Sequence, residues 1–193
     1  LVGLSYFSLD VVLAQDGSLV SSQESDSLTD SGSLSDNKWV SAVGDTLYLA
    51  QTDEQGNVNG LLQMQLDGSN GAKKKEVLPF SQDSYSSAYF SVLGDGTVYA
   101  ADADGFFRCD AGDTNWQKLL QGIDTGFSLS DQWCRDIVAL SDGSVYAWFG
   151  SESGDKIMIY RYDPDAVTEV TEELTLYTVE ESFFLQQAAV QYH

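Results

Sequence analysis

A short pattern of apolar and polar residues recurs four times along the chain. Each copy is an apolar run rich in β-branched and aromatic residues, then a tight turn, then a Ser or Thr that opens a second apolar run. The copies span residues 10–20, 39–48, 89–99 and 136–146. Three of them turn at Asp-Gly, where glycine adopts positive φ without steric cost. The pattern predicts four β-hairpins, with type I′ turns at the Asp-Gly pairs.

The spacing of these hairpins indicates a larger repeat. The hydroxyl residues after the last three turns, Thr46, Thr97 and Ser144, are 51 and 47 residues apart. A four-stranded propeller blade repeats every ~40–50 residues. Further strand-like runs follow each of these hairpins, at 61–66, 77–80, 106–109, 116–120 and 156–162. We therefore expect an all-β fold over residues 1–167, either a propeller or a partial, open propeller of four-stranded antiparallel blades, with an isolated hairpin before the first blade.

Two segments depart from the blade pattern. Residues 21–37 are polar, acidic and rich in Ser, which predicts a mobile low-complexity loop. From residue 168 the sequence pattern differs from that of the blades. Apolar and polar residues alternate over 173–179, as in a strand, and Glu180-Glu181 precede apolar residues at helical spacing. Residues 168–193 therefore read as a linker, then the first strand and helix of a second domain that the chain leaves incomplete.

The charge balance excludes several classes of partner. Thirty Asp and Glu stand against nine Lys and Arg, which gives a formal net charge of −21. Nucleic-acid binding needs a basic stripe, and only the lysines at 73–75, expected at a loop tip, cluster. An anionic membrane would repel the chain, and no run approaches the ~20 apolar residues of a membrane span. We expect no nucleic-acid partner and no direct membrane insertion.

The N-terminus lacks the charged start, long apolar stretch and cleavage site of a signal peptide. We expect either that a targeting segment has been removed or that the chain is a piece of a longer one.

Few residues could support catalysis or tight metal binding. The only histidine is His193, so a Ser or Cys nucleophile has no histidine base in the body of the chain. Cys109 and Cys134 lack CxxC spacing, and both a disulfide and two buried thiols are compatible with them. We expect no enzyme, and no catalytic, cofactor-binding or metal-binding residues.

Two acidic segments have a chemical and a structural interpretation. Residues 102–105 resemble the first positions of a calcium-binding loop but lack the ligands that such a loop has further along the chain. We therefore expect a hairpin turn and no cofactor. A weak calcium site on the surface remains compatible with crowded Asp-Gly turns. Residues 106–116 resemble the Asp-box hairpin of sialidase-like propellers, with Arg108 or Cys109 in place of Ser or Thr and one extra residue before Trp116. That box is a structural turn, so it bears on fold rather than chemistry.

Exposed aromatic residues could bind sugars by stacking on pyranose rings. The candidates are Trp39, Trp116, Trp133 and Trp148. The competing interpretation is that aromatic residues fill the core between sheets.

The order of these features resembles a known family. The segment WVSAVGDTLYLA, the strand ending in Leu-Asp-Gly, and above all the junction YDPDAVTEVTEELTLYTV resemble the N-terminal propeller-like region of bacterial extracellular solute-binding lipoproteins of ABC importers. The resemblance spans roughly residues 38–193.

The resemblance implies a non-enzymatic extracellular module for binding or presentation, with a carbohydrate or peptide ligand. The parent lipoprotein would attach it to the cell surface, beside a downstream solute-binding domain and the importer permease. The alternatives are a sialidase-like or lyase-like glycan-active enzyme, which the scarcity of arginine disfavours, and a purely structural propeller for protein contacts.

Overall fold

The structure is a computed structural model that describes residues 2–4, 8–12, 19–24, 40–53, 57–66, 72–80, 88–102, 105–121, 132–151 and 157–166. These residues form antiparallel sheets of three and four strands and contain no helix, so the prediction of an all-β fold is confirmed. Consequently, no helix in this part of the chain is long and apolar enough to cross a membrane. The predicted strand and helix within 168–193 lie outside the described residues.

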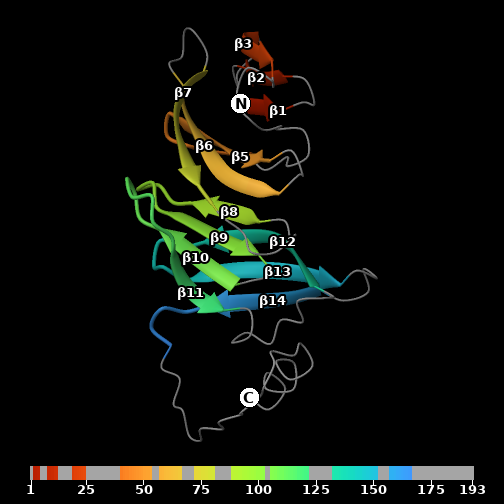
Figure 1. Ribbon diagram of the computed structural model, residues 1–193, viewed down its shortest axis with the longest axis vertical. Helices are drawn as coiled ribbons and strands as arrows, with labels where there is room; N and C mark the ends of the chain where they lie inside the picture. The colour runs from red at the N-terminus through yellow and green to blue at the C-terminus, as the bar shows by residue number, and fades with distance from the viewer. Residues whose placement is uncertain are drawn as a thin grey trace, which may run out of the picture.

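Four sheets follow one another in sequence order (Figure 1). The first contains β1 (Val2–Leu4), β2 (Ser8–Val12) and β3 (Leu19–Glu24). The second contains β4 (Val40–Val43), β5 (Thr46–Thr52), β6 (Val58–Leu66) and β7 (Ala72–Pro79). The third contains β8 (Tyr89–Val92), β9 (Val98–Asp102), β10 (Gly105–Cys109) and β11 (Gln117–Gln121). The fourth contains β12 (Gln132–Ala139), β13 (Val145–Ser151) and β14 (Ile157–Tyr162). Each strand pairs with its neighbours in sequence, as in a meander.

Two segments expected to be loops are partly strands. Residues 21–24 belong to β3 rather than to the predicted 21–37 loop, and β1 adds a third strand to the expected isolated hairpin. The lysines at 73–75 lie within β7 instead of at a loop tip. Both errors have one cause: ladder hydrogen bonds join backbone groups, so polar side chains can continue a strand that its neighbour templates.

The two Asp-Gly turns that the structure describes, at 95–96 and 142–143, lie in hairpins as predicted, but with a different turn type. The Leu93 carbonyl accepts a hydrogen bond from the Gly96 amide at 3.0 Å, and Leu140 and Gly143 are joined in the same way. Only the glycines have positive φ, 92° at Gly96 and 85° at Gly143, whereas a type I′ turn needs positive φ at both central residues. These are three-residue turns that end in a left-handed glycine.

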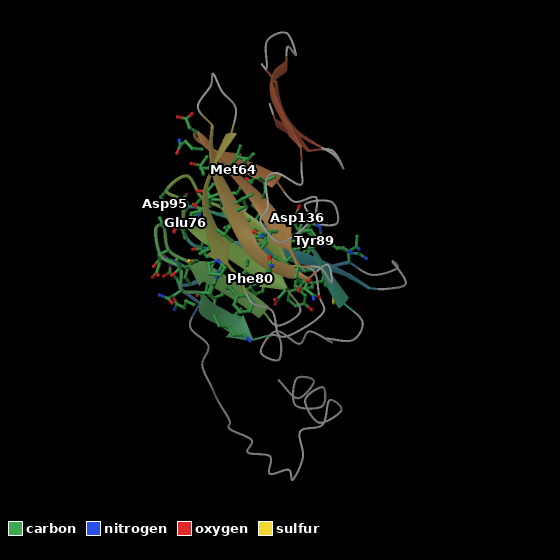
Figure 2. The ribbon with its side chains drawn as sticks, turned by 45° about the horizontal axis from the view of Figure 1, so that its top comes forward. Met64, Glu76, Phe80, Tyr89, Asp95 and Asp136 are labelled. Atoms are coloured by element: carbon green, nitrogen blue, oxygen red, sulfur yellow. The ribbon has the colours of Figure 1, made fainter. Side chains whose placement is uncertain are left out.

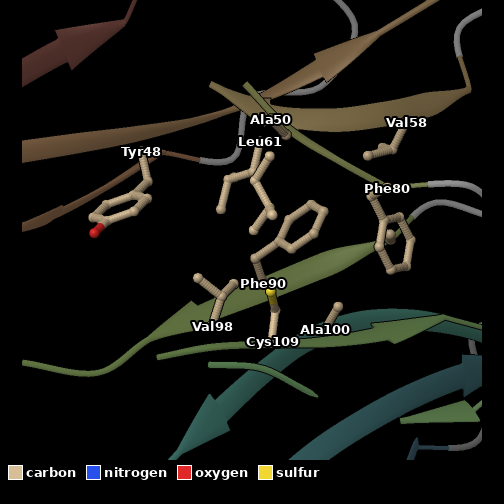
Figure 3. Close-up of a cluster of buried hydrophobic side chains, with 11 residues drawn as sticks. Tyr48, Ala50, Val58, Leu61, Phe80, Phe90, Val98, Ala100 and Cys109 are labelled. Atoms are coloured by element: carbon tan, nitrogen blue, oxygen red, sulfur yellow. The ribbon is translucent and has the colours of Figure 1, made fainter. Parts of the chain in front are cut away.

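The second and third sheets pack face to face through one apolar cluster. Figure 3 shows Ala50 and Leu61 facing Phe90, Val98 and Ala100, with Phe80 beside them. Aromatic rings fill the edge of the cluster: Phe80 meets Phe90 edge-on with ring centroids 5.5 Å apart. Such pairs add about 0.5–1.5 kcal/mol to the effect of burial. The cluster fixes the relative position of the two sheets.

The third and fourth sheets share a second cluster on the opposite face of β9. Because side chains alternate along a strand, Val98 and Ala100 face the first cluster while Tyr99 and Ala101 face the second. The first strands of these sheets also meet: β8 lies alongside β12, and the Ser91 hydroxyl accepts a hydrogen bond from the Ala139 amide at 2.9 Å. The third sheet is therefore covered on both faces.

The outer face of the fourth sheet has no covering sheet among the described residues. Along β14 the side chains alternate between half-buried and exposed, and Ile157 and Ile159 are 73% and 71% exposed. Trp148 lies on the same face, opposite Ile159 in the β13–β14 register. The apolar stripe thus continues across two strands.

Candidate functional site

A cavity of about 250 Å³ opens at one end of the interface between the second and third sheets. The β8–β9 turn, with Asp95 and Gly96, and the β10–β11 loop, residues 110–114, form one side. Tyr48, Gln63 and Glu76, from β5, β6 and β7, form the other. At roughly 30 Å³ per molecule of liquid water, the volume equals that of about eight waters. A small molecule of a few polar groups would fill it.

The cavity is lined by four acidic residues, Glu76, Asp95, Asp110 and Asp113. Figure 2 shows Glu76 and Asp95, which come from different sheets, on the same side of the molecule. The neighbouring Arg108 forms an ion pair with Asp110 at 2.7 Å and so offsets one of the four negative charges. Among the described residues, the lining is therefore strongly anionic.

The local sequence fixes the position of the Asp95 carboxylate. The β8–β9 turn places Asp95 two residues before Thr97, and Asp95 Oδ1 accepts a hydrogen bond from the Thr97 amide at 2.9 Å. That backbone hydrogen bond, followed by one from the Thr97 side chain, lowers the pKa of Asp95. Asp142 occupies the same position in the β12–β13 turn, bonding the Ser144 amide at 2.9 Å, but does not line the cavity.

The β10–β11 loop is held by Asp113 in a similar way. Asp113 Oδ1 accepts hydrogen bonds from the amides of Thr114 at 2.6 Å and Asn115 at 3.1 Å. These backbone hydrogen bonds lower the pKa of Asp113. The Asp113 amide in turn donates to the Asp110 carbonyl at 3.0 Å, which closes the loop. The segment that resembles an Asp box thus acts as a structural turn that also lines the cavity.

Tyr48 is the most buried polar side chain in the lining. It is 6% exposed, and its ring belongs to the apolar cluster between the two sheets. Figure 3 shows its hydroxyl pointing away from Leu61 and Phe90. Burial raises the pKa of Tyr48. A tyrosine hydroxyl can both donate and accept a hydrogen bond.

The arrangement can bind polar ligands through fixed acceptors. Four acidic residues, Gln63 and Tyr48 line one small volume. In the described part of the chain, no three acidic, Cys or His side chains are grouped as ligands of a metal ion. Residues 102–105 were expected to form a hairpin turn, and there Asp102 Oδ1 accepts a hydrogen bond from the Gly105 amide at 3.2 Å.

The four predicted stacking residues have different surroundings. Trp116 is half-buried, its Nε1 donates to the Pro79 carbonyl at 2.8 Å, and its ring centroid is 4.9 Å from that of Phe80. Trp148 is half-buried on the outer face of the fourth sheet. Trp133 occupies a position in β12 of which only the backbone is described, and Trp39 lies outside the described residues. Trp116 and Trp148 thus lie on different sheets and share no platform.

The two cysteines are free and buried. Cys109 packs in the cluster between the second and third sheets, and Cys134 in the cluster between the third and fourth. The sequence was compatible with a disulfide or with two buried thiols, and the structure has two buried thiols. Burial raises the pKa of both, which keeps them protonated and unreactive at neutral pH.

Sequence reasoning missed the cavity, because it treated the aspartates as turn residues only. The turn interpretation is right for Asp95 and Asp113, but these turns also face Tyr48 and Glu76 across the sheet interface. One signal was available: the β8–β9 turn and the β10–β11 loop connect alternate strand pairs of one meander, so they lie at the same end of the sheet. No protein-family model, curated protein or solved structure matches this chain.

Proposed function

We propose that this chain is a non-enzymatic extracellular module for binding and presentation, built from propeller blades, in the solute-binding component of a bacterial ABC importer. Its expected ligand is a carbohydrate, with a peptide as the other candidate. Its partners are the downstream solute-binding domain and the importer permease, and the parent lipoprotein attaches it to the cell surface. The observation that carries the binding role is the polar cavity at the end of an otherwise apolar sheet interface.

The way in which the sheets meet supports the propeller architecture. A propeller blade is a four-stranded meander, and the blades are arranged around a central axis. Radially arranged sheets approach each other most closely at the strands nearest the axis. β4, β8 and β12 are the first strands of the second, third and fourth sheets, and β8 contacts both of the others. The outer face of β12–β14 then corresponds to the side of a blade that the next blade would cover.

The electrostatics of Asp95 and Asp113 support a role as hydrogen-bond acceptors rather than as the acid of a glycoside hydrolase. A glycosidase needs one carboxyl group with a raised pKa to protonate the leaving group. The pKa values of Asp95 and Asp113 are both lowered by hydrogen bonds from backbone amides. Both carboxylates therefore stay ionised at neutral pH and act as acceptors.

A glycan-binding and hydrolysis experiment tests this function. The purified 193-residue chain should bind members of a broad glycan panel and should show no turnover of aryl-glycosides. A flat response across the panel would contradict the carbohydrate-binding role and favour a scaffold for protein contacts. Turnover that one Asp or Glu substitution abolishes would contradict the non-enzymatic assignment.

The family assignment has a separate test. The reading frame beyond His193 should continue into alternating strands and helices of a solute-binding domain. A stop codon directly after His193 would refute this assignment and leave the binding experiment unaffected.

A further inference from the structure

The outer face of the fourth sheet is an exposed apolar surface. All large apolar side chains that are exposed in the described part of the chain belong to this sheet or to its first turn: Val138, Leu140, Ile157 and Ile159. In the strand registers Val138 lies opposite Tyr146 and Ile159 lies opposite Trp148, so these four side chains share one face. Contiguous apolar surface of this kind marks a place where another element docks.

The repeat shows what covers the same face of the earlier sheets. Tyr48, Tyr99 and Tyr146 occupy the same position in three hairpins, two residues after the hydroxyl residue that follows the turn. Tyr48 is buried in the cluster between the second and third sheets, and Tyr99 in the cluster between the third and fourth. In both cases this face packs against the sheet that comes next in the sequence. Tyr146 is only half-buried, so the element that follows in the chain is the one expected to cover it.

We propose that residues 168–181 of this chain dock on the outer face of the fourth sheet. The segment begins shortly after β14 ends at Tyr162. Between them the backbone makes a β-turn, in which the Ala166 amide donates a hydrogen bond to the Asp163 carbonyl at 3.1 Å. At about 3.3 Å per residue, the extended segment reaches roughly twice the length of β14. It is therefore long enough to cross the face and is tethered beside it, which makes docking an intramolecular step.

The face has an unusual share of the positive charge of this acidic chain. Two of the three arginines of the chain, Arg135 and Arg161, lie there. Arg161 lies over the Tyr146 ring at 5.8 Å and also forms an ion pair with Asp163 at 2.9 Å. Arg135 passes over Gly150, because a Cβ at that glycine would lie 3.1 Å from Arg135 Nε. Both guanidinium groups are thus placed beside the apolar residues.

The segment carries the complementary chemistry. Residues 168–181 contain five glutamates and no Lys or Arg, with apolar residues between the glutamates. These acidic side chains can reach the two arginines while the apolar ones cover Ile157 and Ile159. A second copy of the chain fits less well, because two molecules with a net charge of −21 repel each other. The inference does not depend on the ligand or on the importer assignment, but docking would hold whatever follows residue 181 in a fixed orientation.

Thiol labelling of the full chain tests the docking. Ile159→Cys places a thiol on the face, and Gln117→Cys places the control thiol at an exposed position of β11. Mass spectrometry of the labelled peptides distinguishes both from the buried Cys109 and Cys134. A covered thiol reacts only when the cover opens, so Ile159→Cys should react with N-ethylmaleimide about tenfold more slowly than Gln117→Cys, or slower still.

Substitutions in the segment connect this protection to residues 168–181. Leu174→Ser, Leu176→Ser and Tyr177→Ser together remove apolar side chains from both alternations of the segment. In the Ile159→Cys background they should raise the labelling rate to that of Gln117→Cys. Changing the five glutamates to glutamine should raise it as well, because the arginines lose their partners.

Three results would overturn the inference. Equal labelling rates for Ile159→Cys and Gln117→Cys would mean that the face is uncovered. Slow labelling that the triple substitution leaves unchanged would mean that another part of the chain covers it. Slow labelling that is lost on dilution, together with a dimer in sedimentation velocity, would replace the segment by a second copy of the chain.

Discussion

Trp116 gives a direct test of whether an aromatic residue of this chain is a ligand platform or a structural contact. Its indole joins the second and third sheets: Nε1 donates to the Pro79 carbonyl at 2.8 Å. The ring packs edge-on against Phe80, with centroids 4.9 Å apart, and at a tilt against Phe90, with centroids 6.2 Å apart. We therefore expect Trp116 to act in stability and not in binding.

The magnitude follows from these contacts. Replacing a buried Trp by Ala costs about 3–5 kcal/mol, and the half-buried position of Trp116 points to the lower end, about 3 kcal/mol. Trp116→Phe keeps an aromatic ring against Phe80 and removes the hydrogen bond to Pro79, which is worth about 1 kcal/mol. The expected order of stability is wild type, then Trp116→Phe, then Trp116→Ala.

Urea unfolding followed by circular dichroism measures the free energy of unfolding of each variant. Trp148→Ala is the matched control, because Trp148 is also half-buried but lies on a face that no described sheet covers; it should cost less than Trp116→Ala. The reasoning would be refuted if Trp116→Ala left stability unchanged and abolished binding to a glycan. That result would make Trp116 a stacking residue, as the sequence alone allowed.

Two further predictions concern the hairpin turns. Gly143 has φ of +85°, and a Cβ there would lie 3.4 Å from Pro164 Cγ, so Gly143→Ala should lower the free energy of unfolding by about 1–2 kcal/mol. A Cβ at Gly94 would meet nothing within 4 Å, so the control Gly94→Ala should have little effect. Similar melting temperatures for the two variants would contradict this prediction. The pKa values of Asp95 and Asp142 are lowered from 3.8 in the folded state, so their contribution is present above that pH and is lost as pH falls below it. Acid titration of stability should show this loss, and Asp142→Asn should reduce it; a pH dependence unchanged by the substitution would contradict the assignment.

Much of the fold could be predicted from the sequence, because each hairpin is a local structure. The apolar runs at 89–99 and 136–146 become β8–β9 and β12–β13, and the Asp-Gly pairs between them form turns. Alternation along β9 also predicts that its residues divide between two faces. The turn type was wrong, because the sequence pair Asp-Gly fits both a two-residue turn and a three-residue turn that ends in glycine.

The sequence by itself therefore determined most of the strands, their antiparallel order and the places where the chain reverses, since these depend on neighbours only a few residues apart. Only the tertiary structure decided what the side chains do once the sheets face each other. It made Trp116 a contact between sheets, separated Cys109 from Cys134, and brought Tyr48 and Asp113 to one cavity. Tyr48 and Asp113 lie on different sheets, and no local pattern records how one sheet stacks on the next. Their proximity follows from burial of the apolar faces between them, which is a property of the packed molecule.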